Sequence, residues 1–128
     1  MITIGTKATA TTTVTETLSA KTMKSGSLDV YATPAMSALM EEAAAAAVQC
    51  ELEPGQGTVG IHISISHDAA SPIGAHITAT ATVTKVEGRK ITFDLVAQDE
   101  HGTIGKGTHQ RFIIDEAKFM KKVQAKMA

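Results

Sequence analysis

The chain has few aromatic residues: one tyrosine, three phenylalanines and no tryptophan among 128 residues. Proteins that hold single-stranded nucleic acid usually stack its bases on aromatic side chains, so this composition argues against such a function. The charge agrees, because 12 basic and 13 acidic residues leave a formal net charge of −1 and no strong field to attract a polyanion. We therefore expect neither nucleic acid nor an anionic membrane as a partner.

Cysteine is almost absent too. The single cysteine, Cys50, rules out a disulfide within the chain and favours a reducing compartment. The first residues, MITIGTKATATTT, lack the charged start and apolar run of a signal peptide, and no run of about 18 apolar residues occurs anywhere. These absences predict a soluble, cytoplasmic protein. Cys50 has no evident histidine and asparagine partners, so we interpret it as a small buried residue.

Apolar residues make up 43% of the chain, enough for one core, and the length fits a single domain over residues 1–128. The most informative stretch is TPAMSALMEEAAAAAVQ, which is apolar almost all the way round but carries Glu41 and Glu42. Thr33 suits the N-cap of a helix here and Pro34 its first helical position. A helix that is apolar on all sides is a buried helix, and a buried carboxylate needs solvent, a partner or a chemical role.

After this helix the hydrophobic pattern changes to period two, which predicts four strands joined by short turns. An early strand is expected over residues 4–16, and Asp115 is expected to cap a short C-terminal helix. The order strand, helix, four strands and helix predicts an α+β domain with antiparallel neighbours. The alternation places Val59, Ile61, Ile63 and Ile65 on one face and Gly60, His62, Ser64 and Ser66 on the other. The core faces of the next two strands are Ile77, Ala79, Ala81 and Val83, then Ile91, Phe93, Leu95 and Ala97. The apolar stripe of the C-terminal helix is Phe119, Met120, Val123 and Met127.

One face of such a sheet covers only one side of the long helix. The alanine run from Ala43 to Ala47 would let another backbone approach closely. We therefore expect a second copy to cover the rest of the helix, which makes the protein at least a dimer, with symmetric pairing.

Three spaced segments carry a family resemblance: TPAM to LMEEA over residues 33–43, TVG to the histidine at 67, and GKGTHQRF over residues 105–112. Together they resemble the fluoroacetyl-CoA thioesterase-like family of hot-dog fold thioesterases, over about residues 31–115. The resemblance implies a long helix wrapped by a curved antiparallel sheet of about five strands. It also implies a homodimer that hydrolyses an acyl-CoA thioester at its subunit interface, with residues from both chains. Coenzyme A is then part of the substrate, and no separate cofactor is needed.

By the same resemblance, Thr33, Glu41 and His67 are the candidate catalytic residues. Gly60 falls on the strand position that lines the acyl pocket, and Arg111 is the closing arginine of the last segment. The thioester carbonyl would lie near Thr33 and Gly60, where backbone donors stabilise the oxyanion. Glu41 and His67 would activate the nucleophile and transfer protons, with Thr33 either forming an acyl-enzyme or positioning water.

Each candidate also has a purely structural interpretation. Thr33 could be only an N-cap, Glu41 a solvated or paired carboxylate, and His67 a polar residue at a strand end. Arg111 could form a surface ion pair, clamp a carboxylate or CoA phosphate, or support the dimer contact. Glu42 lies about 100° round the helix from Glu41, so only one of them is expected to face a given pocket.

The remaining histidines, at positions 62, 76, 101 and 109, match no spacing of metal ligands, so no metal site is expected. We interpret His109 as making a structural hydrogen bond. Asp68 follows His67 directly, and adjacent strand residues point to opposite faces, so Asp68 is not expected to orient the imidazole.

The substrate itself is less defined. The segment from Met23 to Tyr31 offers only one aromatic residue as an apolar cover for a small acyl group, and residues 24–27 are polar. We therefore expect a general short- or medium-chain acyl thioesterase rather than an enzyme specialised for fluoroacetyl-CoA. The alternatives are a non-catalytic module that binds acyl-CoA or another hydrophobic ligand, and a purely structural dimer.

Overall fold

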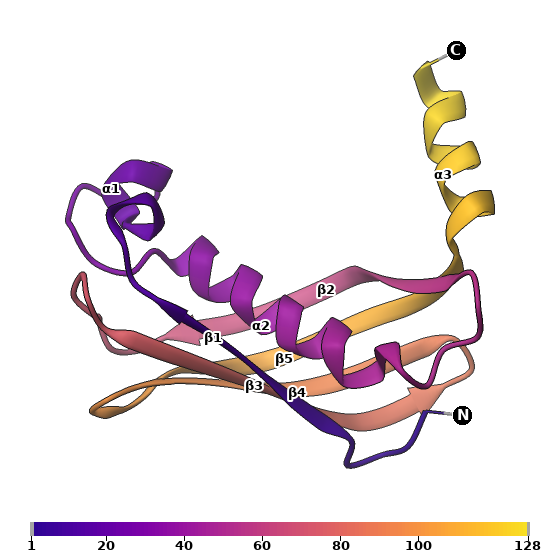
Figure 1. Cartoon of the computed structure of the whole chain (residues 1–128), viewed down its shortest axis with the longest axis horizontal. Coiled ribbons are helices and arrows are strands. Elements are labelled where there is room, and N and C mark those ends of the chain that lie inside the picture. Colours follow the sequence, from indigo (N-terminus) through magenta and orange to yellow (C-terminus); the bar gives the residue numbers. More distant parts are fainter. Residues whose placement is uncertain (1, 128) are drawn as a thin grey trace.

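The computed structural model describes residues 2–127, and its strands form one antiparallel five-stranded sheet in the order β1-β3-β4-β5-β2 (Figure 1). The curled sheet and the single long helix confirm the predicted α+β architecture. The strands are β1 (Lys7–Thr13), β2 (Gln56–His67), β3 (His76–Glu87), β4 (Lys90–Asp99) and β5 (Gly102–Asp115). The helices are α1 (Ala20–Met23), α2 (Thr33–Gln49) and α3 (Glu116–Gln124), with single 3-10 turns at Glu16–Leu18 and Ala125–Met127.

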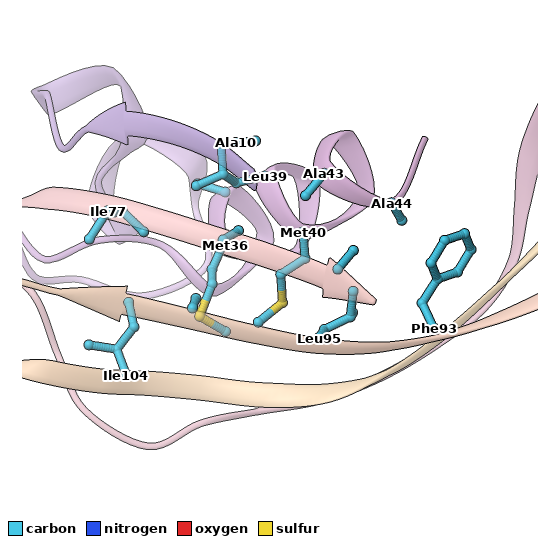
Figure 2. Close-up of a cluster of buried hydrophobic side chains, with 14 of the residues drawn as sticks. Ala10, Met36, Leu39, Met40, Ala43, Ala44, Ile77, Phe93, Leu95 and Ile104 are labelled. Atoms are coloured by element: carbon cyan, nitrogen blue, oxygen red, sulfur yellow. The ribbon is translucent and has the colours of Figure 1, made fainter. Parts of the chain in front are cut away.

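Helix α2 lies along one face of the sheet, mainly against β1 and β3 (Figure 1). Its buried residues recur at the spacing of a helix face, and in Figure 2 Met36 and Met40 point from α2 toward Ile104 and Leu95 on the sheet. All the core positions predicted on β3 and β4 are buried. The buried positions of α2 are Ala35, Met36, Leu39, Met40, Ala43, Ala44, Ala47 and Val48.

The start of α2 differs from the prediction by one residue. Thr33 is the first helical residue and Ala32 is the N-cap, with no side chain capping the helix. Thr33 is therefore not an N-cap, and its hydroxyl is free to bond elsewhere. Pro34 lies in the first turn, where its missing N–H leaves no internal hydrogen bond unmade.

The opposite side of α2 is open. Pro34, Ala38, Glu42 and Ala46, spaced four residues apart, form an exposed stripe along the helix. Within the chain, α2 is thus covered on one side only, although its sequence is apolar nearly all round. The stripe is the part of α2 that a second copy was expected to cover.

Strand β2 does not keep the predicted alternation. Its pairing with β5 shifts register between Gly60 and His62, so Ile61 is an extra residue in a β-bulge and is 50% exposed. A bulge of one residue exchanges the two faces beyond it. Gly60 before the bulge and His67 after it therefore both face α2, although one position is even and the other odd. The predicted face of Val59, Ile61, Ile63 and Ile65 is therefore wrong, because Val59 lies on the face opposite to Ile63 and Ile65 and Ile61 is the bulged residue.

Helix α3 projects away from the sheet (Figure 1). Asp115 caps it as predicted, because its Oδ1 accepts a hydrogen bond from the Lys118 N–H at 3.0 Å. The predicted apolar stripe is not buried within the chain: Met120 is 47% exposed and Val123 41%. Cys50, expected to be buried, is exposed because it follows the last turn of α2 rather than lying within the helix. Over residues 2–127, none of the helices has the length and apolar character needed to cross a membrane.

Candidate active site

A threonine hydroxyl and a histidine ring meet at one end of α2. Thr33 lies in the first turn of α2 and His67 is the last residue of β2. Thr33 Oγ1 and His67 Nδ1 are 2.8 Å apart, within hydrogen-bond distance. Both side chains line a pocket of about 440 Å³, whose other walls include Tyr31 and the loops at residues 25–28 and 68–70. A hydroxyl bonded to a base beside a pocket is the arrangement of an activated nucleophile or of a water-positioning group.

The environment of His67 favours its neutral form. Burial lowers the pKa of the ring, and the nearby Asp68 carboxylate opposes this only in part. The Tyr31 ring meets the imidazole edge-on, with 6.3 Å between centroids. As expected, Asp68 does not orient the ring: its carboxylate accepts a hydrogen bond from the Ser66 hydroxyl at 3.0 Å. A neutral imidazole can accept the proton of the Thr33 hydroxyl.

The Glu41 carboxylate lies two helical turns further along α2. Its side chain is 41% exposed, and its Oε2 lies 3.9 Å from Arg111 Nη1 on β5. Gly60 on β2 faces the same carboxylate, because a Cβ at Gly60 would lie only 3.0 Å from Glu41 Oε2. The missing side chain at Gly60 therefore leaves the space in which the carboxylate sits.

Arg111 is nearly buried and makes three hydrogen bonds to protein groups. Its Nε–H donates to the Thr58 hydroxyl at 2.8 Å and its Nη2–H to the Thr58 carbonyl at 2.9 Å. Nη1 lies 3.2 Å from His109 Nε2. Burial lowers the pKa of the guanidinium, and the Glu41 carboxylate opposes this shift. The protein thus holds the guanidinium at Nε, Nη1 and Nη2, and Nη1 is also the nitrogen that approaches Glu41.

The predicted site residues therefore fall into two groups. Thr33 and His67 share one pocket, while Glu41, Gly60 and Arg111 form a separate cluster. Thr33 and Glu41 are eight positions apart on α2, about 12 Å along the helix axis. Within one chain the structure does not bring the three candidate catalytic residues together.

Sequence reasoning missed two contributors to the Glu41 cluster. Thr58 holds Arg111 from the neighbouring strand. His109 makes the structural hydrogen bond that was predicted, to the His62 carbonyl, but its contact with Arg111 was not foreseen. The feature that could have revealed them is the pairing of β2 with β5, in which Gly60 lies opposite Arg111 and the site residues of the two strands are neighbours. That register depends on the bulge, which the alternating pattern does not reveal.

A curled antiparallel sheet around a long helix, with a hydroxyl–imidazole pair at the start of that helix, defines a hot-dog fold protein of the thioesterase class. A Thermus thermophilus protein described as a thioesterase superfamily member has the same fold, with a TM-score of 0.90 and 28% identity over 98% of this chain and 93% of its own. The family model for fluoroacetyl-CoA-specific thioesterase matches residues 14–117. The chain belongs to this family.

Individual relatives agree. The fluoroacetyl-CoA thioesterase of Streptantibioticus cattleyicolor is 43% identical over 98 residues, which cover 77% of this chain and 70% of the relative. A solved fluoroacetyl-CoA thioesterase, a threonine-to-serine mutant in complex with acetyl-CoA, superposes with a TM-score of 0.93 and 34% identity, over 99% of this chain and all of the other.

Proposed function

We propose that this protein hydrolyses an acyl-CoA thioester to a carboxylic acid and free coenzyme A. The observation that carries the proposal is the 2.8 Å contact between Thr33 Oγ1 and His67 Nδ1 in a pocket at the start of α2. Membership of the fluoroacetyl-CoA-specific thioesterase family supports the same reaction. The substrate brings the coenzyme A, and no further cofactor enters the proposal.

The chemistry follows from this pair. His67 accepts a proton from the Thr33 hydroxyl, or from a water held by it, and the freed oxygen attacks the thioester carbonyl. Backbone N–H groups in the first turn of α2 have no partner within the helix, and they stabilise the oxyanion. The protonated His67 then gives its proton to the departing thiolate. If Thr33 has taken the acyl group, water releases the acid in a second step.

We place Glu41 at this site from a second copy of the chain, so the protein acts as a homodimer. Its own Glu41 is too far along α2 to reach Thr33. The exposed stripe of α2 and the outer edge of β2, which pairs only with β5 among the described strands, are surfaces that a second copy can cover. Gly60 of the partner subunit would then stand near the thioester together with Glu41 of the partner subunit, because the two are neighbours within one chain. Arg111 of the partner subunit would hold that carboxylate in place rather than bind coenzyme A.

For the acyl group we propose a short or medium chain. The pocket wall at residues 25–28 reads Ser-Gly-Ser-Leu, with no aromatic ring to close tightly over a two-carbon acyl group. The exposed cysteine at the end of α2 fits a reducing compartment, and we propose the cytoplasm.

The test is release of free thiol from a panel of acyl-CoA esters by the wild type, Thr33→Ala, His67→Ala and Glu41→Gln. Turnover by the wild type and a fall of about 100-fold or more in His67→Ala are expected for loss of the base. Turnover that survives both His67→Ala and Glu41→Gln would remove these residues from the mechanism. Binding of acyl-CoA without turnover would instead favour the ligand-binding module. If the protein shows neither binding nor turnover, a purely structural dimer is favoured.

Mixing two inactive variants tests the shared site. Thr33→Ala and Glu41→Gln chains are unfolded together, refolded and assayed. Random pairing makes about half of the dimers mixed, each with one intact site if Glu41 acts across the interface, so about a quarter of wild-type activity returns. If Glu41 acts within its own chain, no site is restored. Refolded single variants are the controls.

A further inference from the structure

The bulge in β2 creates an unusual contact for a buried histidine on β5. His109 is 1% exposed, and its Nδ1 lies 2.7 Å from the carbonyl oxygen of His62, the residue that follows the bulged Ile61. At a bulge the regular ladder of backbone hydrogen bonds is interrupted, so a side chain can bond to a strand carbonyl there. Because a carbonyl can only accept, His109 Nδ1 must carry the proton and donate it.

This contact fixes the role of the other ring nitrogen. In a neutral imidazole with Nδ1 protonated, Nε2 carries a lone pair and accepts. The donor it faces is Arg111 Nη1, at 3.2 Å. Burial lowers the pKa of His109, and the hydrogen bond to the His62 carbonyl opposes this shift. Among the charged or titratable side chains around the ring, Arg111 and the His62 imidazole lower the pKa, while Glu41 raises it. On the β4 side the ring stacks on Phe93, with 5.9 Å between centroids, so this side contributes no charge.

The guanidinium is consequently held at all three nitrogens. Thr58 accepts hydrogen bonds from Nε–H and Nη2–H, and His109 accepts one from Nη1–H. Nη1 is also the nitrogen nearest the Glu41 carboxylate. Without the bond to His109, the guanidinium would be held by Thr58 alone, at Nε and Nη2. The 3.9 Å approach to Glu41 Oε2 would then depend on a looser group.

We propose that His109 is a positioning residue of the thioesterase: as a neutral imidazole, bonded to the His62 carbonyl and to Arg111, it holds the guanidinium that orients the Glu41 carboxylate. The inference rests on the proposed function, because only that function gives Glu41 a role. His109 itself need not touch the substrate.

Two substitutions separate the two ring nitrogens. His109→Asn keeps an N–H near the Nδ1 position but removes the acceptor at Nε2. His109→Gln can carry its side-chain oxygen to the Nε2 position and accept from Arg111. We expect kcat to fall by about tenfold in His109→Asn with KM unchanged, since one hydrogen bond to a charged group is lost, and to recover mostly in His109→Gln. A purely structural role predicts no such rescue.

A third arm keeps the two proposals apart. If Glu41→Gln has wild-type kcat, the assignment of Glu41 fails and the proposed function must be revised, whatever His109 does. If Glu41→Gln is slow and His109→Asn has wild-type kcat, only the present inference is overturned. If His109 acts through Glu41, the double variant is no slower than Glu41→Gln, whereas multiplied losses would overturn the inference.

The ring state can also be measured without a variant, in case His109→Asn does not fold. Long-range nitrogen–proton NMR spectra of the wild-type imidazoles distinguish the two neutral tautomers from the protonated ring. We expect His109 to be neutral with its proton on Nδ1 at neutral pH. A proton on Nε2, or a doubly protonated ring, contradicts the inference.

Discussion

Replacing Gly60 with alanine should reduce activity far more than stability. The backbone at Gly60 is not left-handed, so the strand itself tolerates a side chain. The new Cβ would lie 3.0 Å from Glu41 Oε2 and 3.2 Å from His109 Cε1, both closer than ordinary van der Waals contact. His109 is fixed by two hydrogen bonds and buried, whereas the Glu41 side chain is 41% exposed, so the carboxylate is the group that moves.

The two effects can be compared in magnitude. Crowding a packed site costs about 1–3 kcal/mol, and alanine in place of glycine in a strand recovers about 0.5–1 kcal/mol, which leaves a net loss of about 1 kcal/mol in the free energy of unfolding. A catalytic group displaced by a fraction of an ångström can lower the rate by about 10-fold to 100-fold. Urea unfolding and thiol release from an acyl-CoA ester measure these separately.

Gly57→Ala is the matched control. It lies on the same strand, and a Cβ there would lie 3.0 Å from a different glutamate oxygen, Oε2 of Glu116 at the start of α3. It should cost similar stability and leave kcat unchanged. If Gly60→Ala keeps wild-type activity, or if both variants lose activity equally, the placement of Glu41 against Gly60 does not matter for the reaction.

The remaining predictions concern stability. Burial lowers the pKa values of both His67 and His109 below the usual histidine value of 6.5. As the pH falls below 6.5, the unfolded chain therefore binds more protons than the folded chain. The free energy of unfolding decreases as the pH falls from 6.5 toward the folded-state pKa values. Urea unfolding from neutral pH to about pH 5 should show this loss, and a curve independent of pH would contradict the buried neutral rings. Phe93→Ala should lower the free energy of unfolding by about 3–5 kcal/mol, because Phe93 is fully buried in the core. A loss of under about 1 kcal/mol would mean that the core is not closed there. Gly107→Ala should prevent soluble expression, because the new Cβ would overlap the Ser64 carbonyl oxygen on the paired strand β2. A soluble variant with the wild-type melting temperature would show that β2 and β5 are paired differently.

Much of the fold was predictable because its signals are local. Period-two alternation identified β3 and β4 and their core faces, and the apolar 17-residue segment identified α2. The start of α2 was misplaced by one residue, because Thr33 and Ala32 cannot be told apart as N-cap until the bonding of the hydroxyl is known. The exposure of Cys50 was missed because cysteine is usually a buried residue type, and its type does not show which way a residue after the helix end points.

The candidate site was predictable as a set of residues but not as an arrangement. The family resemblance selected Thr33, Glu41 and His67, yet gave no distances among them. In the structure Thr33 and His67 bond directly, whereas Glu41 contacts Arg111 about two turns away. Only the folded chain shows that one copy is insufficient to gather all three residues, which supports the shared site that the resemblance implied.

The sequence by itself determined the elements, the faces of the central strands and the residue types available for chemistry, because these follow from spacing along the chain. The tertiary structure decided which residues meet. Strict alternation places Gly60 and His67 on opposite faces of β2, and the bulge at Ile61 turns both toward α2. A bulge depends on how β2 pairs with β5, a contact between segments about 50 residues apart, so no local pattern in either segment could specify it.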